Sequence, residues 1–118
     1  MTKDTEQEQR LEIVIKIAHQ YLQALIKYCN DNNVDSITKD VIKSERVVKF
    51  DMLLTERLLI SRREVEVLMM KGCDTLADIL IDVLKEENVD RLKLSTLEDF
   101  EKKWDWKEIF KGITNPND

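Results

Sequence analysis

Residues 50–84 read FDMLLTERLLISRREVEVLMMKGCDTLADILIDVL, and this is the most apolar and best punctuated stretch of the chain. Ser61 and Glu64 have the Ser-x-x-Glu spacing of a capping box, in which each side chain can bind a free backbone N–H of the other residue. This spacing predicts a helix that begins at Arg62. The leucine pairs upstream of it predict a preceding helix that ends near Ile60.

Gly72 is expected to end the helix that begins at the capping box, because glycine adopts the left-handed conformation after a helix without steric cost. Asp74 can then cap a further helix over residues 75–86. The whole stretch is therefore predicted to form three consecutive helices joined by tight connections.

The composition bounds the fold class. The chain has 118 residues, 36% of them charged, with two Gly and one Pro. So few helix breakers favour an all-α protein, and we expect a compact bundle of five to six helices in a single domain. We assign residues 1–8 to a disordered N-terminus, residues 9–112 to the bundle and residues 113–118 to a disordered tail. We expect no internal repeat, low-complexity run or domain linker.

A long helix is predicted over residues 8–29, where apolar side chains recur every three or four positions. Residues 34–49 are rich in β-branched side chains, which leaves a short strand or hairpin open. Because the chain offers no evident partner strand, we favour two short helices broken near Ser44. The core is expected to contain Leu22, Leu25, Ile26, Leu53, Leu54, Leu68, Leu80 and Leu84.

The C-terminal part has a second Ser-x-x-Glu pair, Ser95 and Glu98, which predicts a helix that continues to Gly112. Residues 88–94 are expected to form a turn or a helical turn before it. Trp104 and Trp106 point in different directions on a helix, so we expect one in the core and the other at an edge.

The net charge of -5 argues against a general nucleic-acid binder, which needs a basic surface. Residues 1–10 are polar and do not resemble a signal peptide. No apolar run reaches the ~20 residues of a membrane-spanning helix. We therefore expect a cytoplasmic protein that does not bind membranes.

Side chains that could carry catalysis are scarce. His19 is the only histidine, and its apolar neighbours favour a packed or surface side chain over a catalytic base. Cys29 and Cys73 are too few for a disulfide framework and are expected to be buried thiols in a reducing compartment. The chain has no zinc or di-iron ligand motif and no glycine-rich phosphate loop. We expect no enzymatic activity, no cofactor and no metal site.

The charge pattern is more informative. A row of acidic side chains recurs every four residues, and a group of arginines precedes it. The acidic row comprises Asp74, Asp78, Asp82 and Glu86, and the arginine group comprises Arg57, Arg62 and Arg63. The acidic row could be a solvated helix face, a docking face for a basic partner or a calcium site. One side of a helix is a poor source of calcium ligands, which normally come from a folded loop.

Residues 51–61, 64–68 and 75–84 together resemble the middle of a caspase-recruitment domain, a six-helix member of the death fold. They match in order and approximate spacing a Leu-Leu pair, an acidic short helix and an Ala-x-x-Leu-type helix. The resemblance implies an adaptor-like domain that assembles through charged faces. In that arrangement Asp78 and Asp82 would oppose the arginine group.

We therefore expect a non-enzymatic protein–protein interaction module, an adaptor, regulator or inhibitor that binds another protein or itself. The alternative is a transcription regulator, because residues 60–80 also resemble a helix-turn-helix with its turn at Gly72. The acidic row on the would-be reading helix opposes contact with phosphates. A regulator that binds another protein of a transcription complex would not meet this objection.

Overall fold

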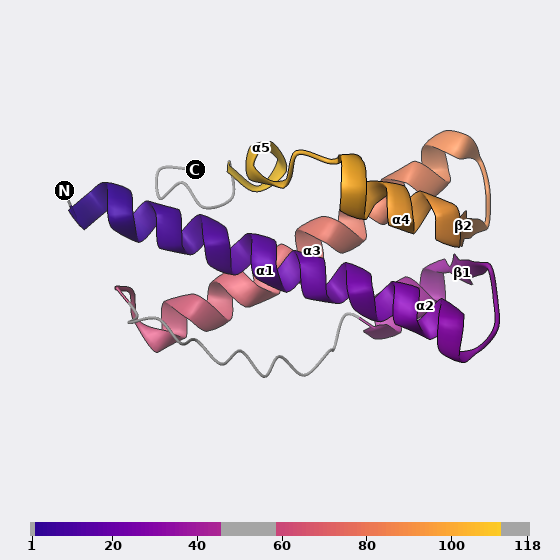
Figure 1. Ribbon diagram of the computed structural model, residues 1–118, viewed down its shortest axis with the longest axis horizontal. Coiled ribbons are helices and arrows are strands. Elements are labelled where there is room, and N and C mark those ends of the chain that lie inside the picture. The colour runs from indigo at the N-terminus through magenta and orange to yellow at the C-terminus, as the bar shows by residue number, and fades with distance from the viewer. Residues whose placement is uncertain (1, 46–58, 112–118) are drawn as a thin grey trace.

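The computed structural model describes residues 2–45 and 59–111, which form a helical bundle with one small two-stranded sheet (Figure 1). The elements are α1 (Thr2–Asp31), β1 (Ser36–Thr38), α2 (Lys39–Glu45), α3 (Arg62–Glu87), β2 (Arg91–Lys93), α4 (Leu94–Lys103) and α5 (Trp106–Lys111). The expected all-α bundle is confirmed. No helix within the described ranges is long and apolar enough to cross a membrane.

The core lies between the two long helices, α1 and α3, which run in the same direction toward the sheet and cross on the way (Figure 1). Five of the expected core leucines are buried there: Leu22, Leu25, Leu68, Leu80 and Leu84. Ile26 is half-buried and packs against the core. Leu53 and Leu54 lie outside the described residues.

The prediction that Gly72 ends a helix is wrong. α3 continues through Gly72, which is buried in its middle. A Cβ at this position would lie 3.1 Å from the Val14 carbonyl oxygen and 3.6 Å from Ile17 Cγ2. Glycine is therefore needed here because α1 approaches closely, and not because the backbone turns. The two helices that we expected over residues 62–71 and 75–86 are one, so the turn of the alternative helix-turn-helix is not formed.

The chain contains an internal repeat, which contradicts our expectation from the sequence. Residues 13–45 and residues 68–100 each form the end of a long helix, a three-residue strand and a short helix. The sequence Asn-Val-Asp occurs at 33–35 and again at 88–90, directly before each strand. Equivalent positions in the two repeats are 55 residues apart.

The repeats also agree in local geometry and burial. Asn33 and Asn88 have left-handed φ angles of 55° and 53°. In each repeat the following valine donates its N–H to the carbonyl oxygen five residues earlier, at 2.9 Å in the first repeat and 3.1 Å in the second. Buried positions of the long helices correspond at Ile13/Leu68, Ile17/Gly72, Ala18/Cys73, Tyr21/Leu76, Leu22/Ala77, Leu25/Leu80 and Cys29/Leu84.

The two strands pair antiparallel, with Ile37 opposite Leu92. Ile37 and Leu92 are equivalent residues of the two repeats, so the two strands pair symmetrically about this position. The long helices also cross at equivalent residues, because Gly72 lies against its own equivalent, Ile17. The two repeats are therefore related by an approximate two-fold axis through the sheet and the helix crossing.

This pairing corrects two predictions. Residues 34–49, which we expected to form two short helices, contain β1 followed by α2 as far as they are described. Residues 88–94, expected to form a turn, contain β2. We expected no partner strand for residues 34–49, but β2 pairs with β1. Inside the bundle, the Tyr21 hydroxyl donates a hydrogen bond to the Ile42 carbonyl oxygen and holds α2 against α1.

The second capping box is not formed. α4 begins at Leu94, and no side chain caps its first turn. The expected single helix is also interrupted: α4 ends at Lys103, and Asp105 Oδ1 accepts a hydrogen bond from the Glu108 N–H at 3.2 Å to begin α5. Gly112 lies outside the described residues.

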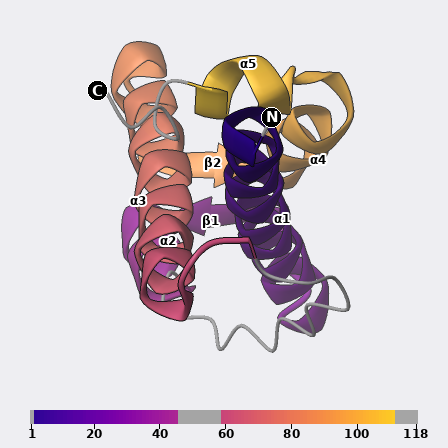
Figure 2. The ribbon, with the colours of Figure 1, turned by 90° about the vertical axis from the view of Figure 1, so that its left-hand side faces the viewer.

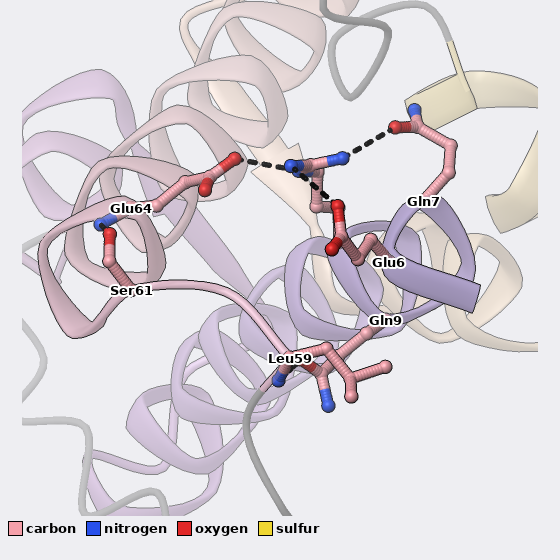
Figure 3. A network of polar contacts seen from close by, with 7 residues as sticks. Glu6, Gln7, Gln9, Leu59, Ser61 and Glu64 are labelled. Carbon is pink, nitrogen blue, oxygen red and sulfur yellow. Dashed lines mark hydrogen bonds and ion pairs between the residues drawn. The ribbon is translucent and has the colours of Figure 1, made fainter. Parts of the chain in front are cut away.

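The first turns of α1, which we expected to be disordered over residues 1–8, are helical from Thr2. Figure 3 shows how they are joined to the start of α3. Arg10 Nε donates to Glu64 Oε1 at 2.6 Å, and Gln9 Oε1 accepts from the Leu59 N–H at 2.8 Å. Ser61 Oγ accepts from the Glu64 N–H at 3.1 Å, so the predicted N-cap is confirmed.

Candidate functional site

The candidate site is the solvent-facing side of α3, opposite the side that packs on α1. In Figure 2, α3 lies on the left, where it overlaps α2, while α1 and α4 lie on the right and α5 lies at the top. Three- and four-residue steps bring eight exposed side chains onto this side. We call this set the outer face of α3: Arg63, Val67, Met70, Lys71, Asp74, Asp78, Asp82 and Lys85.

The outer face combines charge with exposed apolar surface. Met70 is 67% exposed and Val67 is 43% exposed, which makes them two of the four exposed large apolar side chains among the described residues. The charged residues of the N-terminal half of the face are the cations Arg63 and Lys71. The C-terminal half carries three anions, Asp74, Asp78 and Asp82, and ends at the cation Lys85.

The structure brings the predicted acidic row together on one helix. Its four carboxylates, Asp74 to Glu86, are all exposed, and at ~1.5 Å per residue the row spans about 18 Å. Arg62 and Arg63 are also exposed, but they lie in the first turn of the same helix. Arg57 lies outside the described residues. The opposite charges therefore share one helix, which the sequence does not indicate, because a glycine such as Gly72 is typical of a helix end.

The order of these charges opposes the dipole of the helix. The N-terminus of a helix favours anions and its C-terminus favours cations, by about 0.3–1 kcal/mol for each exposed charge. In α3, Arg62 and Arg63 are at the N-terminus, and Glu86 and Glu87 are at the C-terminus. Two charges have the sign that the dipole favours: Glu64 in the first turn, which forms an ion pair with Arg10, and Lys85 in the last turn. Helix stability therefore does not explain the charge pattern of α3.

The repeat shows how two positions of the same surface are used on α1. There α5 packs against the helix, and the Trp106 ring meets His19 edge-on at 5.9 Å between ring centroids. The position of α3 equivalent to His19 is Asp74, and that equivalent to the half-buried Ile15 is the exposed Met70. His19 is therefore a packed side chain. Trp104 and Trp106 are both half-buried, which differs from the core and edge positions that we expected.

An open depression of about 730 Å³ lies beside the paired strands. Its charged lining is mixed in sign and includes Asp90, Arg91 and Glu98. Arg91 Nε donates to Ser36 Oγ at 2.7 Å, so this guanidinium links the two repeats. Over residues 2–45 and 59–111, no three His, Cys, Asp or Glu side chains are grouped so that they could hold a metal ion.

Both cysteines are buried, as expected, and neither forms a disulfide bond. Cys29 lies in the last turn of α1, near Ser36 and Arg91 of the paired strands. Burial raises the pKa of its thiol, and the Asp35 carboxylate adds to that effect, while the Arg91 guanidinium opposes it. A buried thiol with a raised pKa is a poor nucleophile at neutral pH.

No protein-family model matches the chain, and no match was found among curated proteins or among solved structures.

Proposed function

We propose that this protein is a non-enzymatic interaction module, an adaptor, regulator or inhibitor that works in the cytoplasm by binding protein through the outer face of α3. The observation that carries the proposal is one continuous exposed helix side, with Val67 and Met70 between two cations in its N-terminal half and mostly carboxylates in its C-terminal half. Interfaces commonly combine an apolar centre with a charged rim that selects the partner and its orientation.

One further feature supports the proposal. The charges of α3 are ordered against the helix dipole, so their order is better explained by a partner than by the fold. Each exposed ion pair with a partner would contribute only about 0–1 kcal/mol, so several pairs together must select it.

The alternative, a regulator that reads DNA through residues 60–80, has less support. That reading requires a turn at Gly72, where α3 is continuous. The C-terminal half of α3 is also acidic, and phosphate contacts require cations. A modulator that binds another protein of a transcription complex belongs to the class of function proposed here.

Affinity capture from the native host tests the proposal, with three baits compared side by side. The baits are the wild type, Asp78→Lys on the outer face of α3 and Glu98→Lys on α4, a control with the same change of charge. We expect at least one protein to be retained by the wild type and by Glu98→Lys but lost with Asp78→Lys. Capture that is equal for all three baits would contradict the proposal, provided that circular dichroism shows all three folded.

A further inference from the structure

We infer that the partner of the outer face of α3 is a second copy of this chain, bound antiparallel about a two-fold axis near the middle of the helix. The inference rests on the proposed function and names the partner of the same surface. In such a symmetric contact both copies use one surface, so each pair of residues is formed twice.

Charge complementarity carries the inference. Two cations of the outer face, Arg63 and Lys71, precede its three anions along the helix, and one cation, Lys85, follows them. When a second α3 runs in the opposite direction, its acidic half lies against the basic half of the first, and the reverse is true at the other end. Arg63 then lies near Asp82 of the second copy, and Lys71 lies near Asp74. A parallel pair would instead place like charges together.

The apolar side chains fit the same arrangement. Met70 lies close to the midpoint between Arg63 and Asp82, so the two Met70 side chains come together near the axis. Methionine is unbranched and adapts to irregular surfaces, which suits a contact between two identical helices. Val67 extends the apolar centre by one turn toward the N-terminus.

Sedimentation velocity of the wild type, over about 5–500 µM protein, tests whether the dimer forms. We expect a concentration-dependent dimer at about 50 mM salt, with its Kd raised roughly tenfold or more at about 500 mM salt, because screening weakens exposed ion pairs. A chain that is monomeric throughout this range would overturn the inference.

Two charge-reversal variants test the arrangement. The first, Arg63→Glu with Lys71→Glu, leaves Lys85 as the only cation on the outer face. The second, Asp78→Lys with Asp82→Lys, makes the other half basic, with only Asp74 left as an anion on the face. We expect each variant alone to be monomeric and an equimolar mixture to form a heterodimer, because opposite charges meet again at both ends.

The control is Lys102→Glu with Lys107→Glu, which changes the net charge as the first variant does but lies on α4 and α5. This control should dimerise as the wild type does. Dimers that survive both reversals, a mixture that does not associate, or a control as monomeric as the first variant would each overturn the inference. If the wild type is monomeric but a captured protein is still lost with Asp78→Lys, the second copy is excluded as the partner and the proposed function stands. If the wild type is monomeric and capture is equal for all baits, both the inference and the proposed function are contradicted.

Discussion

Ile37 and Leu92 lie directly opposite each other in the two-stranded sheet, and both side chains are buried where the two repeats meet. Because the residues are equivalent, substitution of either should disrupt the same contact. We expect Ile37→Ala and Leu92→Ala each to lower the free energy of unfolding by about 2–5 kcal/mol. The double variant should cost less than the sum, since the two side chains share one site.

Urea denaturation followed by circular dichroism measures these costs. The control is Val89→Ala, which removes a side chain next to the same sheet that is 42% exposed, and it should change stability by no more than about 0.5 kcal/mol. A cost near zero for either buried residue would show that the sheet does not join the repeats.

Gly72→Ala tests the close approach of α1 and α3. Alanine is favoured over glycine inside a helix by about 1 kcal/mol, but its Cβ would lie 3.1 Å from a backbone oxygen of Val14. We expect no net gain in stability from Gly72→Ala, and a loss of about 1–3 kcal/mol from Gly72→Leu, because overpacking moves the helices apart. The neighbouring exposed Lys71→Ala is the control. Stabilisation by Gly72→Ala would show that the helices are not in close contact there.

Tyr21→Phe tests the hydrogen bond that holds α2. The variant keeps the ring but leaves the buried Ile42 carbonyl oxygen without the hydroxyl donor, which should cost about 1–3 kcal/mol. Hydrogen exchange measured by mass spectrometry should be faster in α2 of the variant than in α2 of the wild type, and this increase should be larger than any increase in α4. The half-buried Tyr28→Phe serves as control. Equal exchange of α2 in Tyr21→Phe and the wild type would argue against this role.

The pH dependence of stability tests the raised pKa of Cys29. An unfolded thiol ionises near pH ~8.5, below the pKa of the buried thiol, so the unfolded state loses its proton first. This contribution to stability is complete below pH ~8.5 and is lost as the pH rises toward the folded pKa. Cys29→Ala should lower stability at every pH but show a shallower fall between about pH 8 and 10. Parallel curves for the two proteins would contradict the assignment.

Local signals in the sequence were sufficient for some features and not for others. Ser61 was read correctly because a cap depends on residues within one turn of it. Gly72 was misread because a glycine can serve either a turn or a close approach, and only the position of α1 decides between them. The strands were missed because each has three residues and its partner is far along the chain.

The candidate site shows the same division. The acidic row from Asp74 to Glu86 follows from a four-residue period, which is a local pattern and could be read directly. That Arg62 and Arg63 belong to the same helix could not be read, because it depends on the helix continuing through Gly72. The repeat was the clearest signal missed: Asn-Val-Asp at 33–35 and at 88–90 marks equivalent positions, but three identical residues are few.

Photo-cross-linking from position 70 tests most directly whether the outer face of α3 is where this protein meets another chain. A benzophenone amino acid replaces Met70, which is 67% exposed, and in a control protein it replaces the exposed Glu98 on α4. We predict an adduct from position 70 with twice the 14.0 kDa mass of the chain, and none of that mass from position 98. Adducts from position 98 but not from position 70, or none from either, would contradict the account.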